Sequence, residues 1–199
     1  MEEKEIQDEL ASIRNLMERS SKFISLSGLS GVLAGVYALI GAGVAYNIIY
    51  GGSATFGVLY SIYGLAAIAL AVLIASLVTG YILTARKAKR RGQAIWGNVS
   101  RALLFNMAVP LVSGGLFIFI FLYHGHYSVV APTSLIFYGL ALVGASNFTF
   151  TDVKYLGLCE VVIGLIAACL PGYGLLFWAI GFGVLHIIYG SMMYFKYDK

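Results

Sequence analysis

Two ionisable side chains stand out because each lies alone in an apolar, glycine-rich stretch. Glu160 lies in LGLCEVVIGLIAACLPGYG, residues 156–174, and His186 lies in GYGLLFWAIGFGVLHIIYG. An ionised carboxylate in a bilayer costs about 3 kcal/mol on insertion scales, so such a residue normally faces a partner or water rather than lipid. A carboxylate and an imidazole can together hold or pass a proton. These two residues are therefore the first candidates for chemistry.

Glycines flank both groups at helical spacing, three residues before and four after. They are Gly157, Gly164, Gly183 and Gly190. Such positions share a helix face, and small-residue faces in membranes tend to pack against protein. If two antiparallel helices turn near Gly172, Glu160 and His186 differ in depth by only about 3 Å. The sequence predicts an intramembrane polar site in which this pair lies opposite each other, with three candidate neighbours: Asn106, Tyr155 and Tyr189. Two roles fit it: a proton-handling or ligand-binding site, and an interhelical hydrogen bond that fixes helix register.

The remaining chemistry-bearing residues predict no catalytic or metal site. His124 and His126 lie in a loop that has no Cys, Asp or Glu to complete a metal shell, so we expect interfacial polar residues. Cys159 and Cys169 are ten residues apart in one helix, about 15 Å along its axis, which is too far for a disulfide. Phosphate-binding, zinc-protease and hydrolase motifs are absent from the sequence. We expect no cofactor, and a non-enzymatic role is favoured.

The elements that carry these residues follow from composition and charge. Of 199 residues, 60% are hydrophobic and 11% are charged, which is typical of a membrane protein. Three long segments without charge, 23–85, 102–151 and 161–195, alternate with charged stretches. A span needs about 20 apolar residues, so these segments accommodate six helices. The predicted fold is an all-α membrane protein with six transmembrane helices in three hairpins, at 23–46, 57–84, 102–123, 132–149, 154–170 and 174–195.

Positive charge predicts the orientation. If the N-terminus is cytoplasmic, all 13 Lys and Arg residues fall on the cytoplasmic side, as the positive-inside rule requires. The sequence therefore predicts a multi-pass protein with both termini inside. The start, MEEKEIQDEL, lacks the basic region and early apolar core of a signal peptide, so we expect the first span to be retained.

Residues 1–22 are predicted to form a separate cytoplasmic helix before the bundle of residues 23–199. Apolar side chains recur there at spacings of four, three and four: Ile6, Leu10, Ile13 and Met17. This single stripe is typical of an amphipathic helix. It fits a helix lying on the membrane or the bundle, and it also fits self-association or docking of a cytoplasmic protein partner.

The predicted loop 86–101 is strongly basic and carries no acidic residue. Its charges are Arg86, Lys87, Lys89, Arg90, Arg91 and Arg101. Contact with anionic lipid headgroups, worth about 1 kcal/mol per charge, explains it best. Nucleic-acid binding is not expected, because no recognisable module surrounds the charges and the net charge is only +4.

Small residues in the first predicted helix indicate close helix packing. Ser27, Gly31 and Gly35 lie four residues apart, which lets helix backbones approach closely. Packing within the bundle and formation of a homo-oligomer both fit this pattern. A repeated motif, Tyr63-Gly64-Leu65-Ala66 and Tyr138-Gly139-Leu140-Ala141, hints at duplicated hairpins.

Three stretches, RNLMERSSKFISLSGLSGVLAG, APTSLIFYGLAL and GYGLLFWAIGFGVLHIIYG, carry a resemblance to known proteins. The chain resembles, over nearly its whole length, a family of uncharacterised bacterial integral membrane proteins. The resemblance implies a bacterial inner (cytoplasmic) membrane location and six spans. It implies no activity, cofactor or catalytic residue.

Three functional hypotheses follow from these observations. The preferred one is a membrane sensor, regulatory or interaction module that engages a partner on the cytoplasmic side. The alternative is a small transporter or proton-coupled carrier that uses Glu160 and His186. A membrane enzyme or redox-cofactor protein ranks third, because no motif supports it.

Overall fold

The computed structural model describes a helical protein. It covers Ile6, Gln7, Leu10, Ile13 and residues 26–51, 58–90, 92 and 95–198, without the side chains of residues 58–61. Within these residues there are helices and turns and no β-strand. The principal helices are α2 (Gly28–Tyr50), α3 (Val58–Arg90), α4 (Asn98–Tyr123), α5 (Val130–Ala145) and α6 (Asp152–Cys169).

The last helical segment is irregular. It consists of α7 (Gly174–Trp178), a π-helical stretch η4 (Ala179–Leu185), α8 (His186–Met193) and a second π-helical stretch η5 (Tyr194–Asp198). We call the whole of it the C-terminal helix. Single π-helical turns are rare inside α-helices and are frequent at functional sites. In this chain the first of them carries Gly181, which contacts the buried carboxylate described below.

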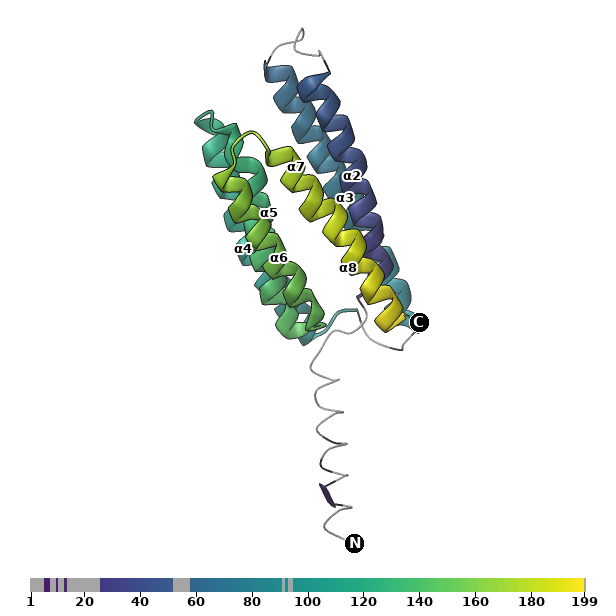
Figure 1. Ribbon diagram of the computed structural model, residues 1–199. Coiled ribbons are helices and arrows are strands. Elements are labelled where there is room, and N and C mark those ends of the chain that lie inside the picture. Colours follow the sequence, from purple (N-terminus) through teal and green to yellow (C-terminus); the bar gives the residue numbers. More distant parts are fainter. Residues whose placement is uncertain are drawn as a thin grey trace.

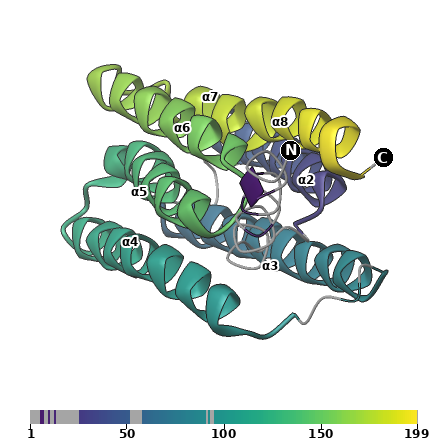
Figure 2. The ribbon, with the colours of Figure 1, turned by 90° about the horizontal axis from the view of Figure 1, so that it is seen from below.

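The helices form two groups that lie side by side (Figures 1 and 2). In one group α5 lies between α4 and α6, and in the other α2 lies between α3 and the C-terminal helix. The C-terminal helix links the groups, because α7 contacts α5 while α8 packs on α2. The third predicted hairpin thus differs from a simple pair: α6 packs mainly on α5 and its successor mainly on α2.

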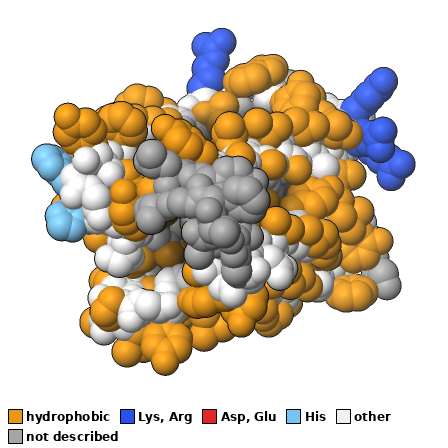
Figure 3. All heavy atoms as spheres, turned by 90° about the horizontal axis from the view of Figure 1, so that it is seen from above, with side chains coloured by type: hydrophobic (Ala, Val, Ile, Leu, Met, Phe, Trp, Pro, Cys, Tyr) orange, Lys and Arg blue, Asp and Glu red, His pale blue; other side chains and the backbone are white. Residues whose placement is uncertain are grey.

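The two ends of the bundle differ in charge. The uncharged end carries Gly51, the loop 124–126 and the turn 170–173, and the charged end carries Asp152, Lys196 and Asp198. Figure 3 looks onto the uncharged end, where hydrophobic side chains cover most of the described surface and histidines lie at one edge. Large apolar side chains also remain exposed along the outer helices α3 and α4, as expected for contact with lipid: Leu70, Leu77, Phe105 and Phe119.

Five described helices are long and apolar enough to cross a membrane. They are Gly28–Tyr50, Ile62–Arg90, Asn98–Tyr123, Tyr127–Phe148 and Gly174–Asp198. These are the features of a multi-pass membrane protein. The remaining predicted span, α6, has 18 residues and is not among the five. It carries three charged side chains: Asp152, Lys154 and Glu160.

Several helix boundaries differ from the predictions. α2 continues to Tyr50, α3 continues to Arg90 and α4 begins at Asn98, so both ends of the predicted loop 86–101 are helical. The predictions followed the apolar runs, but Lys and Arg are good helix formers and are stabilised in a last turn by the helix dipole. The predicted segment 1–22 lies mostly outside the described residues; four of its residues are helical with exposed side chains, namely Ile6, Gln7, Leu10 and Ile13.

Glycine brings α2 into backbone contact with the C-terminal helix. A Cβ atom added to Gly35 would lie 2.6 Å from the Gly183 oxygen and 2.9 Å from the Ile187 nitrogen. One added to Gly31 would lie 3.2 Å from the Gly190 Cα atom. Gly31 and Gly35 therefore face the protein's own C-terminal helix, which leaves this face covered in the monomer.

A second glycine contact joins α5 to α6. A Cβ atom added to Gly157 would lie 2.6 Å from the Gly139 oxygen, and one added to Gly164 would lie 3.0 Å from the Pro132 oxygen. Both glycines that flank Glu160 therefore bind α6 closely to α5. This contact fixes the depth and rotation of Glu160.

Candidate functional site

Glu160 lies at the junction of α6, α5 and the C-terminal helix. Its side chain is fully buried, with 0% exposure. Gly181, in the π-helical stretch, presents bare backbone to the carboxylate: a Cβ atom there would lie 2.5 Å from Glu160 Oε2. The absence of a side chain at Gly181 therefore makes the space that the carboxylate occupies.

His186 contacts three groups around this carboxylate. Its Nδ1 atom lies 3.1 Å from the Gly181 carbonyl oxygen and 3.4 Å from Glu160 Oε1. Its Nε2 atom lies 2.8 Å from the Tyr138 hydroxyl. A carbonyl oxygen can only accept, so the Nδ1 atom carries a proton in this hydrogen bond. Neutral His186 then accepts from Tyr138 at Nε2, and the imidazolium donates to the Tyr138 oxygen instead.

Aromatic and aliphatic side chains enclose the cluster. Phe182 stacks on His186 with ring centroids 6.0 Å apart and lies 5.0 Å from the Tyr138 ring. Leu135, which is fully buried, covers the same glycine that faces Glu160. Such surroundings lower the local dielectric constant and strengthen every electrostatic interaction within them.

The Glu160 carboxylate has little compensation for its burial. Neither of its oxygens makes a hydrogen bond within the described residues, and the 3.4 Å approach of His186 is an ion-pair contact. Buried charges are stable only when they are paired or neutralised. With one proton on the pair, it is either neutral or an internal ion pair; adding or removing a proton leaves a net charge in a dry junction.

The three predicted neighbours are not part of this contact. Asn106 is exposed on α4 and donates to the Ala102 carbonyl 2.8 Å away. Tyr155 is exposed on α6. Tyr189 lies one turn beyond His186, toward the charged end, with a buried hydroxyl. Sequence spacing identified polar residues but could not establish which helix faces would meet.

Two members of the cluster, Tyr138 and Gly181, were missed by the sequence analysis. Tyr138 belongs to the repeated Tyr-Gly-Leu-Ala motif, yet its counterpart Tyr63 is 72% exposed on the outer helix α3. The two copies therefore occupy different environments, and the motif does not mark equivalent positions. The signal that could have found Tyr138 is its place one residue before Gly139, which contacts α6.

A second polar cluster, which we call the clasp, ties together three helix ends at the charged end. Asp198 accepts hydrogen bonds from the Gly28 backbone nitrogen at 2.9 Å and from the Ser27 hydroxyl at 3.2 Å. It also pairs with Lys87, whose ammonium group donates to the Leu26 carbonyl at 2.7 Å. Asp198 thereby caps the N-terminus of α2, where a negative charge is favoured by the helix dipole.

Lys87 therefore differs from its predicted role in contacting lipid headgroups. Its side chain is only 13% exposed, because it reaches inward to Asp198 and lies 5.6 Å from the centre of the Phe150 ring. Four other predicted headgroup contacts are exposed: Arg86, Lys89, Arg90 and Arg101. Arg91 lies outside the described residues.

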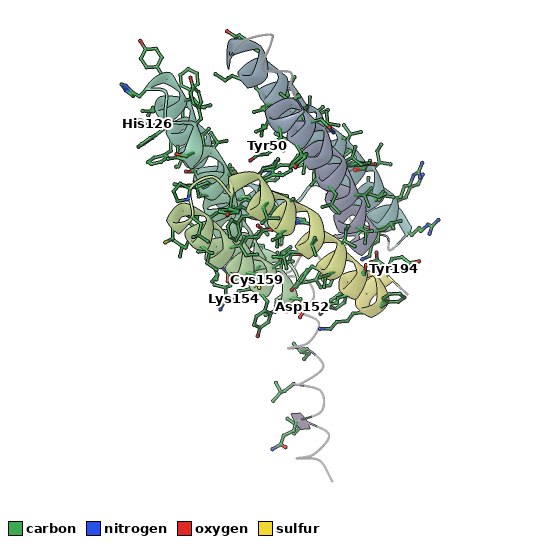
Figure 4. All side chains as sticks on the ribbon, turned by 45° about the horizontal axis from the view of Figure 1, so that its top comes forward. Tyr50, His126, Asp152, Lys154, Cys159 and Tyr194 are labelled. Carbon is green, nitrogen blue, oxygen red and sulfur yellow. The ribbon has the colours of Figure 1, made fainter. Side chains whose placement is uncertain are left out.

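A third polar cluster lies beside the clasp. Asp152 accepts hydrogen bonds from Lys196 and from the Tyr197 hydroxyl, both at 2.7 Å. The hydrogen bond from Lys196 holds the pKa of Asp152 below its usual range. Figure 4 shows Asp152, Lys154 and Tyr194 at this end of the molecule.

The remaining candidates lie at the surface. His124 and His126 are exposed at the uncharged end, and Cys159 and Cys169 are exposed thiols on α6. Among the residues that the structure describes, no three His, Cys, Asp or Glu side chains gather to hold a metal ion. In comparisons with known proteins, no family model, curated protein or solved structure matches the chain.

Proposed function

We propose that the chain is a membrane regulatory protein whose helix bundle responds to proton occupancy of the Glu160–His186–Tyr138 cluster. The observation that carries this proposal is the fully buried Glu160 carboxylate, which makes no hydrogen bond to the part of the chain that the structure describes and lies 3.4 Å from His186. Ionisable groups inside membranes are costly and mark functional sites by default. The cluster lies where α6 and α5 meet the helix that links the two groups, so its net charge acts on their relative position.

The proposed topology has six spans in a bacterial inner membrane, namely the five long apolar helices and α6, with both termini in the cytoplasm. Support comes from the two ends of the molecule: Tyr50 and His126 lie at one, and Asp152, Lys154 and Tyr194 at the other (Figure 4). The charged end would be cytoplasmic by the positive-inside rule. In α6, Asp152 lies at the end and pairs with Lys196, and Glu160 faces His186 inside the bundle rather than lipid, so these charges do not prevent a span.

The proposed output is a change at the charged end. His186 and Asp198 lie on the same helix, and twelve residues correspond to about 18 Å along its axis. Displacement of this helix would disturb the clasp and with it the start of α2 at Gly28, six residues after segment 1–22 ends. The exposed stripe of Ile6, Leu10 and Ile13 would dock a cytoplasmic protein, and the exposed basic residues would contact anionic lipid headgroups.

The test measures whether proton occupancy moves the two groups. Spin labels would be attached at Ile40 on α2 and Val162 on α6, both exposed, after Cys159 and Cys169 are replaced by serine. In proteoliposomes the distance between labels should change with pH, and Glu160→Gln should abolish the change. A distance that is constant with pH, or that changes equally in Glu160→Gln, contradicts the proposal.

A second candidate, a proton-coupled carrier, is favoured by the same buried pair, because carriers use such groups to load and release protons. Liposomes that contain a pH-sensitive dye distinguish the two. A regulator should give equal, negligible proton flux in the wild type and Glu160→Gln, with and without ion gradients. Flux that is lost in Glu160→Gln would replace the regulatory proposal with the carrier.

A further inference from the structure

A cavity of about 400 Å³ opens at the charged end of the bundle, between the start of α6 and the end of the C-terminal helix. Its lining residues are Asp152, Tyr189, Met192, Met193, Phe195 and Lys196. A water molecule occupies about 30 Å³ in the liquid, so the cavity has room for several. The Asp152–Lys196 pair gives it a charged mouth, with hydrogen-bonding groups that can orient water.

Tyr189 is the deepest polar group in this cavity's lining along the C-terminal helix. Its hydroxyl is buried beside the Leu156 backbone and makes no well-formed hydrogen bond within the described residues. A buried hydroxyl without a partner is destabilising, and water in the cavity would relieve this cost. Tyr189 follows His186 by three residues, so it lies on the same face about 4.5 Å further along the axis. It thus separates the charged mouth from the buried cluster.

We propose that protons reach the Glu160–His186 pair from the charged end, through this cavity, with the Tyr189 hydroxyl as the relay. This inference rests on the proposed function, because it names the access route to the same site. On α6, eight residues separate Asp152 from Glu160, a rise of about 12 Å. Water in the cavity beside Asp152 and the Tyr189 hydroxyl would form this path.

Tyr189 gains one proton and releases one in this relay, so its hydroxyl group is unchanged at the end. A hydronium ion at the mouth gives a proton to water in the cavity, and that water gives one to the Tyr189 oxygen. Tyr189 then releases its original hydroxyl proton to the Glu160 carboxylate and ends neutral. The cluster gains one proton and one positive charge, and the only co-reactant is water.

The groups around the route suit this direction. Titratable side chains near Tyr189 are Asp152 and Cys159 of α6 and Tyr197 of its own helix. At the deeper position, Glu160 and His186 contact each other, and Tyr138 of α5 is the further titratable side chain that contacts His186. By contrast, the described residues that line a cavity at the uncharged end are all uncharged: Ala42, Tyr46, Tyr50, Gly172, Tyr173, Leu175, Leu176 and Ala179. Of these two cavities, the one at the charged end has charged side chains, Asp152 and Lys196, that can orient water.

The test compares two tyrosines, one at each end. Tyr189→Phe removes the relay hydroxyl and keeps the ring, and Tyr173→Phe is the matched control in the opposite cavity. After a rapid pH jump, time-resolved infrared spectroscopy follows the carboxyl band of Glu160, assigned by its loss in Glu160→Gln. We expect Tyr189→Phe to slow protonation at least tenfold without changing the equilibrium titration, and Tyr173→Phe to leave the rate unchanged.

The other outcomes separate the two proposals. Equal rates in wild type and Tyr189→Phe, or slowing by Tyr173→Phe instead, would overturn the access route while leaving the regulatory site intact. A wild type without a pH-dependent band from Glu160 would overturn the proposed function itself. If Tyr189→Phe unfolds, as judged by circular dichroism, Asp152→Asn replaces it and should slow the same rate.

Discussion

Substitution of Gly35 by alanine tests whether backbone contact holds α2 to the C-terminal helix. The new Cβ atom would lie 2.6 Å from one backbone atom and 2.9 Å from another, whereas ordinary contact begins at 3.4 Å. The helices must therefore separate locally by about 0.8 Å, which forfeits a quarter to a half of each affected dispersion contact. Backbone atoms cannot rotate away, so we expect a cost of about 2–3 kcal/mol, toward the upper end for overpacking.

The same helix provides the control. Gly43 has no atom within 4 Å of its added Cβ, so Gly43→Ala should gain only helix propensity, about 0.5–1 kcal/mol. Both variants share that gain, and their difference isolates the packing cost. Reversible unfolding in mixed micelles by dodecyl sulfate, followed by circular dichroism, measures it. If Gly35→Ala were as stable as Gly43→Ala, the backbone contact would not contribute as argued.

Three further variants test the polar clusters. Asp198→Asn should lower the free energy of unfolding by about 1–3 kcal/mol. The double variant with Lys87→Met should lose less unfolding free energy than the sum of the losses in the two single variants. Because the pKa of Asp152 is lowered, the ionised carboxylate stabilises the folded state above the usual carboxyl pKa, and this stabilisation is lost as pH falls below about 4. In Asp152→Asn, with Lys196 in place, the free energy of unfolding should no longer show this acid-dependent loss. Gly181→Ala should displace the carboxylate it faces, cost about 1–3 kcal/mol by thermal unfolding, and shift that carboxyl's infrared band. An unshifted band would show that the carboxylate does not occupy the space beside this glycine.

The sequence predicted an all-helical chain with long apolar helices because hydropathy and charge segregation act over whole segments. Counting residues to a turn predicted similar depths for Glu160 and His186, and His186 Nδ1 lies 3.4 Å from Glu160 Oε1. Helix ends were harder to predict from the sequence. The apolar run of α3 stops before Arg86, but basic residues continue the helix to Arg90. Apolar length and helix length are different quantities.

Contacts between helices distant in sequence could not be predicted in the same way. Tyr138 joins the cluster only because α5 lies between α4 and α6, and Lys87 turns inward only because Asp198 arrives from another helix. Residue spacing identifies a face, but the partner of that face depends on the arrangement of the whole bundle. The π-helical stretch that presents Gly181 is likewise a product of tertiary packing rather than of an isolated sequence signal.

The clasp has a consequence for how the protein is made. Its hydrogen bond from Gly28 to Asp198 joins residues separated by 170 positions, and the glycine face of α2 is covered by the same late segment. Translation proceeds at about 5–20 residues per second, so α2 waits roughly 10–30 seconds in the membrane before its partner exists. During that interval its small-residue face is open to lipid, to the insertion machinery and to other nascent chains. Biogenesis of this fold therefore includes a period in which α2 needs protection that the finished bundle later supplies.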